Sequence, residues 1–127
     1  MPNTFSPSKE LVEGARREGT LFWHSSWGQA NTHLMMTEFV DRFPFLIVAG
    51  VPRLQAFPDM EEERRMGQHY IDIIGPTTAT TVARYADQGY FAAHESPYTK
   101  ALPIEYRDPQ HRWFATHNVG MAFTYNT

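Results

Sequence analysis

The sequence predicts an α/β fold in which a mostly parallel sheet carries helices on its faces. Short apolar runs alternate with amphipathic stretches along the first 90 residues, as in successive βαβ units. The chain has 127 residues, of which 42% are hydrophobic and 20% charged, which is typical of a soluble globular domain. Both observations favour one compact α/β unit over a disordered or coiled-coil chain.

Charge and residue usage exclude several classes of function. The formal net charge is −3, so no basic excess indicates a nucleic-acid partner. The absence of cysteine excludes disulfides and thiolate metal sites. The longest apolar run, Phe45 to Val51, is too short to span a membrane, and Met1 to Ser8 lacks the pattern of a secretory signal.

The first predicted elements are a helix, a buried strand and a second helix. Ser8 can cap the first helix and Gly19 can end it, and residues 20–24 then form a strand that ends at Ser25 and Ser26. The second helix covers residues 31–43 and stops at Pro44. Its predicted apolar stripe consists of Met35, Met36, Phe39, Val40 and Phe43.

The next elements continue the alternation. Residues 45–51 predict a strand, residues 55–68 an exposed charged helix, and residues 70–74 a third strand. A further amphipathic helix follows residues 75–78 and ends at Gly89. Beyond it, residues 90–112 predict loops and short helical turns, and two strands are predicted at residues 113–117 and 119–125.

A ligand site is expected beyond the carboxyl ends of the strands, where parallel sheets bind ligands. Ser25 and Ser26 offer hydroxyl and backbone N–H groups there, and Thr77 and Thr78 stand at a helix N-terminus that attracts anions. The alternatives are a polar turn for the serines and a simple helix cap for the threonines. Trp27 could stack on a solute or pack in the core.

Histidines add weaker candidates. His24 could ligate a metal, although a packed, hydrogen-bonded side chain is the favoured interpretation. His117 follows a predicted strand and could approach the cleft. The six histidines show no spacing typical of a zinc site. Ser25 and Ser26 lack the Gly-x-Ser-x-Gly context of a hydrolase nucleophile, so a small serine hydrolase is a third, less favoured hypothesis.

Several segments, in order, resemble family 1 extracellular solute-binding proteins, in particular the ferric-iron type of ABC transporter component. The similar segments are Leu11–Gly19 with Leu21–Ser26, Glu63–Gly67 with Asp72–Ile74, and Ala101–Pro103 with Tyr106–Pro109, Trp113 and Tyr125–Thr127. The resemblance implies a type II periplasmic binding fold that closes two lobes on a solute and delivers it to an ABC permease, without catalysis. It also implies that Asp72 has a structural role, bonding a neighbouring loop.

Under this resemblance, residues 1–127 correspond to an incomplete first lobe, and the second lobe is absent. Ser25, Ser26, Trp27, Thr77, Thr78 and His117 would line its cleft wall. The solute would be a small anion or ferric iron carried as cargo, with no resident cofactor, and the parent protein would be periplasmic or extracellular. We expect such a lobe to bind solute weakly or not at all.

The main alternative is a self-associating module with no ligand function. An incomplete lobe would leave sheet edges and apolar surface uncovered, and exchange of equivalent elements between two copies would cover them. We therefore expect a homodimer, swapped through residues 90–127.

Overall fold

The computed structural model describes residues 6–52, 56–76, 78–117, 120 and 122–124. Contacts divide the chain into two compact units, residues 1–77 and 78–127. The first unit contains α1 (Lys9–Glu18), β1 (Thr20–Ser25), α2 (Gln29–Arg42), β2 (Ile47–Pro52), α3 (Ala56–Arg65) and β3 (Ile73–Gly75). The second contains α4 (Ala79–Asp87) and the short 3₁₀ turns η1 (Thr99–Ala101) and η2 (Ile104–Tyr106).

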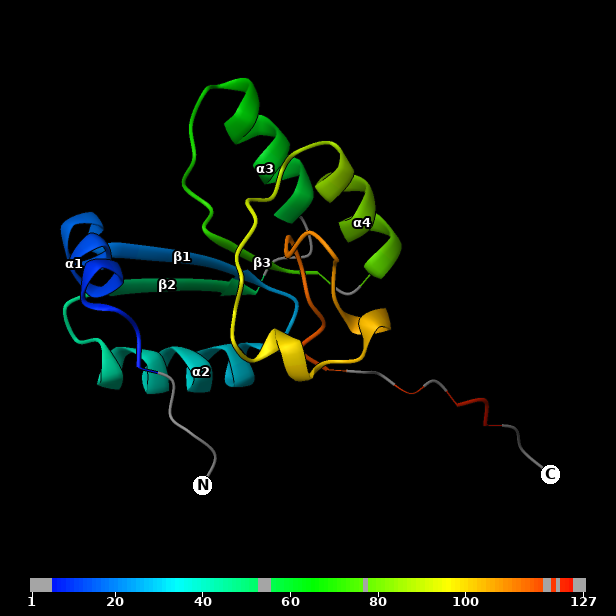
Figure 1. Ribbon diagram of the computed structural model, residues 1–127, viewed down its shortest axis with the longest axis horizontal. Helices are drawn as coiled ribbons and strands as arrows, with labels where there is room; N and C mark the ends of the chain where they lie inside the picture. The colour runs from blue at the N-terminus through cyan, green and yellow to red at the C-terminus, as the bar shows by residue number, and fades with distance from the viewer. Residues whose placement is uncertain (1–5, 53–55, 77, 118–119, 121, 125–127) are drawn as a thin grey trace. The chain divides into compact units, whose positions relative to one another are not determined.

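The first unit is built on a three-stranded, all-parallel sheet with flanking helices, which confirms the predicted α/β class (Figure 1). The strand order is β2-β1-β3, so the first strand of the chain lies in the middle. Thr20 pairs with Ile47 at one end of β1, and Ser25 pairs with both Pro52 and Gly75 at the other. All three carboxyl ends therefore meet at one edge.

The ends of α1 follow the sequence closely. The Ser8 hydroxyl accepts a hydrogen bond from the Leu11 N–H at 3.2 Å, which is the expected N-terminal cap. Gly19 ends the helix with a φ of 74°, a left-handed conformation that glycine adopts without the steric penalty of a β-carbon. Both predicted signals are confirmed.

The side of α2 that faces the sheet is narrower than the predicted apolar stripe. Thr32 is 2% exposed, and Thr32 and Met36 lie against Gly50 in β2. Met35 and Phe39, by contrast, are 47% and 36% exposed, so including them in a buried stripe was wrong. A helix turns 100° per residue, and the close contact at Gly50 places Met36 rather than Met35 toward the sheet.

The third strand is shorter and later than predicted, because side chains hold the residues before it. The Glu63 carboxylate accepts hydrogen bonds from the Tyr70 and Ile71 N–H groups at 3.0 and 3.1 Å. Asp72 accepts from the Phe22 N–H at 2.7 Å, and its own N–H donates to the Phe22 carbonyl. Asp72 therefore extends the pairing with β1 by one residue. Its role is structural, but its partner is a strand and not the neighbouring loop that we expected.

In the second unit, α4 ends before Gly89, and η1 and η2 fulfil the prediction of short helical turns. The predicted strand at 113–117 is wrong, since only Phe114 pairs, in an isolated bridge with Arg107. The predicted strand at 119–125 falls partly outside the described residues, and its described positions 120 and 122–124 are not in a strand. The turn at residues 108–111, in which the His111 N–H donates to the Asp108 carbonyl, joins the two bridged residues. Longer pairing would need an extended partner before Arg107, where Ile104–Tyr106 instead form η2.

A buried ion pair holds this turn. Arg112 donates to both carboxylate oxygens of Asp108, at 2.7 and 3.1 Å, and to the Ala86 carbonyl at the end of α4 at 2.9 Å. Asp108 is 5% exposed. The guanidinium hydrogen bond holds the pKa of Asp108 below its ordinary value, against the opposing effect of burial. The pair thereby ties residues 108–113 to α4.

Candidate functional site

The candidate site lies at the carboxyl edge of the sheet in the first unit. β1 connects to β2 on one side, and the chain then passes to β3 on the other side of β1. Such a reversal of strand order leaves a crevice beyond the strand ends, where open α/β sheets bind their ligands. Here the residue that follows β1 is joined to the last residue of β3, because the Ser26 N–H donates to the Gly75 carbonyl at 2.9 Å.

The two serines have different surroundings. Ser25 is 1% exposed, and its hydroxyl accepts from the Trp27 N–H at 3.0 Å. The Ser26 side chain is half-buried. The Ser26 N–H was expected to be available to a solute, but it already donates to the Gly75 carbonyl, and the Trp27 N–H is likewise occupied by the Ser25 hydroxyl. Ser25 therefore shapes the turn, and Ser26 is the serine whose side chain is accessible.

Trp27 packs against its own unit. Its ring lies edge-on to the Trp23 ring, with centroids 5.6 Å apart, and its carbonyl accepts from the Thr32 hydroxyl at 3.3 Å. The Trp27 ring is half-buried, and part of its surface packs against the Trp23 ring. This contact fixes the loop between β1 and α2.

The N-terminus of α2 is a feature that the sequence analysis missed. Its N-cap is Gly28, which supplies no side-chain hydrogen bond, and its first turn contains no acidic residue. By contrast, Glu10 stands in the first turn of α1 and Asp59 in the first turn of α3. The uncapped N–H groups and the positive end of the helix dipole favour an anion at α2. The Gly28-Gln29 sequence before an amphipathic run was the available signal.

His24 is buried and faces α3. It is 3% exposed, and its Nδ1 lies 3.9 Å from an Asp59 carboxylate oxygen, beyond hydrogen-bond distance. Its ring contacts that of Phe22 on the same side of β1. The packed histidine is thus as expected, but Nδ1 has no hydrogen-bond partner in the described structure. Asp59 as its neighbour could not be found from sequence spacing.

The remaining candidates belong to the second unit or lie outside the described residues. Thr78 is the N-cap of α4, with no side-chain cap hydrogen bond and no acidic residue in the first turn. His117 is exposed, and its Nδ1 shares a 2.9 Å hydrogen bond with the Thr116 hydroxyl. Thr77 lies outside the described residues.

Among the residues that the structure describes, no three histidine, aspartate or glutamate side chains gather as they would around a metal ion. No helix in the described part of the chain combines the length and apolar character that a membrane span needs. Comparison of the chain with protein-family models and with curated proteins finds no match.

Proposed function

We propose that this chain forms the solute-facing part of the first lobe of an α/β binding protein, which captures a small anionic solute for an ABC importer. The observation that carries the proposal is the strand order β2-β1-β3, which puts the ends of β1 and β3 side by side at a switch point. The resemblance to family 1 extracellular solute-binding proteins supports the same assignment.

The chemistry of this edge favours an anion. The segment from Ser25 to Asn31 carries no charged side chain, and α2 begins within it without a side-chain cap. A solute carboxylate or phosphate there would accept hydrogen bonds from helix N–H groups and gain from the dipole. The side chains of Ser26, Gln29 and Asn31 supply further hydrogen-bond donors in the same segment.

Affinity should be low in this chain alone, because a binding cleft buries its ligand from two sides. We expect inorganic phosphate to bind with a dissociation constant of about 1 mM. In a ¹H–¹⁵N NMR titration, the amide signals of residues 26–31 should shift with phosphate and not with chloride at the same ionic strength.

A matched pair of variants tests the location. Gln29→Glu places a carboxylate in the first turn of α2 and should weaken phosphate binding by at least about fivefold, while slightly stabilising the helix. Gln110→Glu makes the same charge change at an exposed position of the second unit and should leave the affinity unchanged. Equal effects of the two variants, or shifts confined to other residues, would refute the proposed site.

A further inference from the structure

Asp108 is the one aspartate of the sequence that is followed by a proline. The peptide nitrogen of a proline belongs to a tertiary amide, and in acid it is protonated more readily than an ordinary peptide nitrogen, so it leaves more easily. An aspartate carboxylate can act as a nucleophile. The Asp108–Pro109 bond therefore has a nucleophile on one side and a good leaving group on the other.

The folded second unit holds each polar group of Asp108. Its carboxylate accepts hydrogen bonds from Arg112, from Nε at 2.7 Å and from Nη2 and the backbone N–H at 3.1 Å each. Its carbonyl accepts from the His111 N–H, and its N–H donates to the Trp113 carbonyl, both at 3.0 Å. To reach its own carbonyl carbon, a carboxylate oxygen must leave the guanidinium group. Because the side chain is only 5% exposed, that movement requires local opening of the turn.

We propose that the Asp108–Pro109 bond is a self-cleavage site, which the ion pair with Arg112 keeps intact while the second unit is closed. When the unit opens in acid, the carboxylate attacks the carbonyl carbon of Asp108 and forms a cyclic anhydride. The bond to Pro109 breaks, and the proline nitrogen takes a proton from the solvent and leaves as a secondary amine. One water molecule then opens the anhydride, so that Asp108 ends the first fragment with a new terminal carboxyl group.

The two partners of the ion pair lie on opposite sides of the bond that breaks. After cleavage, Asp108 belongs to the fragment 1–108 and Arg112 to the fragment 109–127. Closing the turn again would require two separate chains to meet. Cleavage therefore makes the opening of the second unit irreversible, whereas it is reversible in the intact chain. The inference does not depend on the proposed solute site, which lies in the first unit.

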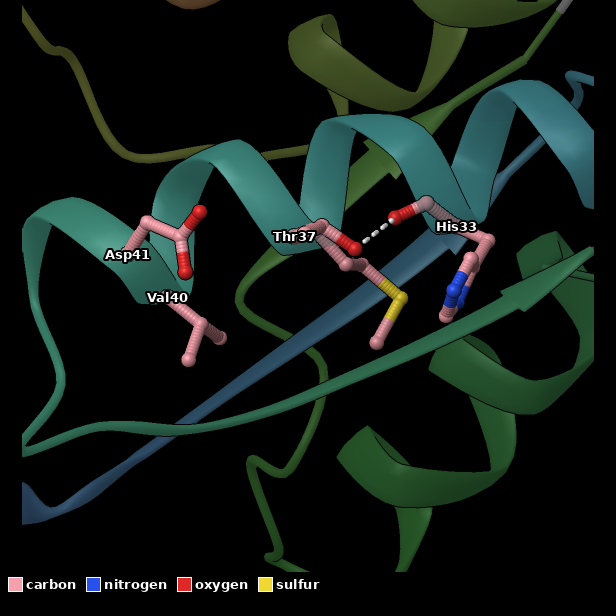
Figure 2. A pocket seen from close by; sticks show the side chains of 5 residues that line it. His33, Thr37, Val40 and Asp41 are labelled. Atoms are coloured by element: carbon pink, nitrogen blue, oxygen red, sulfur yellow. Dashed lines mark hydrogen bonds between the residues drawn. The ribbon is translucent and has the colours of Figure 1, made fainter.

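Asp41 provides an internal comparison. It is exposed and lines an open groove along α2 (Figure 2). The next residue is Arg42, whose peptide nitrogen belongs to an ordinary secondary amide. An accessible carboxylate before such a nitrogen should leave its own bond intact, so Asp41 separates the effect of the leaving group from the effect of exposure.

Intact-mass spectrometry of the full chain tests the proposal at the lowest pH at which circular dichroism shows the chain folded, with and without urea. In urea we expect the fragments 1–108 and 109–127, whose masses together exceed that of the chain by one water molecule. Without urea the cleavage should be at least about tenfold slower, since a slow reaction of the open state follows the population of that state. Pro109→Ala should leave the chain intact in urea. Equal rates with and without urea, an uncleaved chain in urea, or equally fast cleavage after Asp41 would overturn the proposal.

Arg112→Gln tests the role of the ion pair. It should accelerate the cleavage without urea and leave the rate in urea unchanged, because the guanidinium group no longer holds the carboxylate in an unfolded chain. Tyr85→Ala is the matched control, since it removes a buried ring of α4 and destabilises the same unit without removing the pair. For the same loss of unfolding free energy, Arg112→Gln should accelerate the cleavage more. Equal acceleration would mean that the fold protects the bond without the ion pair, and it would contradict the proposal.

Discussion

Asp108 and Arg112 form an ion pair whose loss should lower the stability of the second unit. Arg112 also reaches Asp87 with its Nη2 at 3.2 Å, but the Asp87 side chain is 74% exposed. The contribution of each carboxylate to stability therefore differs, because water screens the interaction with Asp87 more strongly than the interaction with Asp108.

Asp108→Asn should lower the free energy of unfolding by about 2 kcal/mol, since it leaves a guanidinium without its buried counter-charge. Asp87→Asn is the matched control and should change it by less than about 0.5 kcal/mol. Urea unfolding followed by circular dichroism measures both. Equal destabilisation by the two variants would contradict the assigned difference in burial.

The same residue sets a pH dependence. The pKa of Asp108 is lowered in the folded chain, so its contribution is fully present above the unfolded aspartate pKa of about 3.9. The contribution is lost as the pH falls from there through the lowered folded pKa. Asp108→Asn should remove this part of the acid sensitivity, and the difference between the two proteins should therefore shrink below about pH 4.

At the level of elements, the packing of α2 on β2 depends on the missing side chain of Gly50. A β-carbon at Gly50 would overlap the Met36 sulfur and press on the Thr32 methyl group. Thr32 is buried and branched at Cβ, so it has little freedom to move away. The close contact therefore requires glycine at this point of the strand.

Gly50→Ala should destabilise the chain by about 1–3 kcal/mol through overpacking. Combined with Met36→Ala, which removes the overlapping sulfur, it should cost clearly less than the sum of the two single changes. Urea unfolding of the four proteins completes the cycle. Additive effects would mean that Met36 does not lie over Gly50.

The elements that the sequence predicted best are those whose ends carry local signals. Ser8 and Gly19 act through hydrogen bonds and backbone angles within a few residues, and both ends of α1 are confirmed. The start of β3 depends on Glu63 and Asp72 reaching residues distant in the chain, and the predicted strand began too early. Asp108 and Pro109 were a turn signal within the region predicted as loops. A strand at 113–117 needed an extended partner, and that place is taken by the 3₁₀ turn at Ile104–Tyr106.

The same distinction holds for the candidate site. The alternation of strands and helices in the sequence predicted a parallel sheet, in which the carboxyl ends of the strands lie at the same edge. It therefore placed Ser25, Ser26 and the end of β3 together correctly. Which N–H groups remain free there depends on tertiary contacts, such as the bond from Ser26 to Gly75. The hydrophobic periodicity of the sequence does not reveal these contacts, and it does not predict that Asp59 lies beside His24.

At the scale of the whole molecule, each of the two units contains a network of side-chain hydrogen bonds of its own. Glu63 and Asp72 bind backbone groups of residues 22 and 70–71 in the first unit. Asp108 and Arg112 connect residues 86, 87 and 108–113 in the second. Because these two networks join residues of one unit each, we expect the loss of either to loosen its own unit first.

Hydrogen exchange measured by mass spectrometry can test this independence. Asp108→Asn should accelerate exchange in residues 106–115 and leave β1 as protected as before, whereas Glu63→Gln should accelerate exchange at Tyr70 and Ile71 and leave residues 106–115 unchanged. If either variant accelerated exchange in both units, the two would form one cooperative whole.

The central place of β1 has a consequence for how the chain is made. During synthesis, β1 emerges first, yet the hydrogen bond from Phe22 to Asp72 joins residues 50 positions apart. The edge of β1 that pairs with β3 therefore stays unpaired until β3 has left the ribosome. Contacts between residues so far apart in the sequence slow folding, and an unpaired strand edge can meanwhile pair with strands of other chains. The apolar strand on which the sheet is centred is thus the segment that a nascent chain would most need to shield.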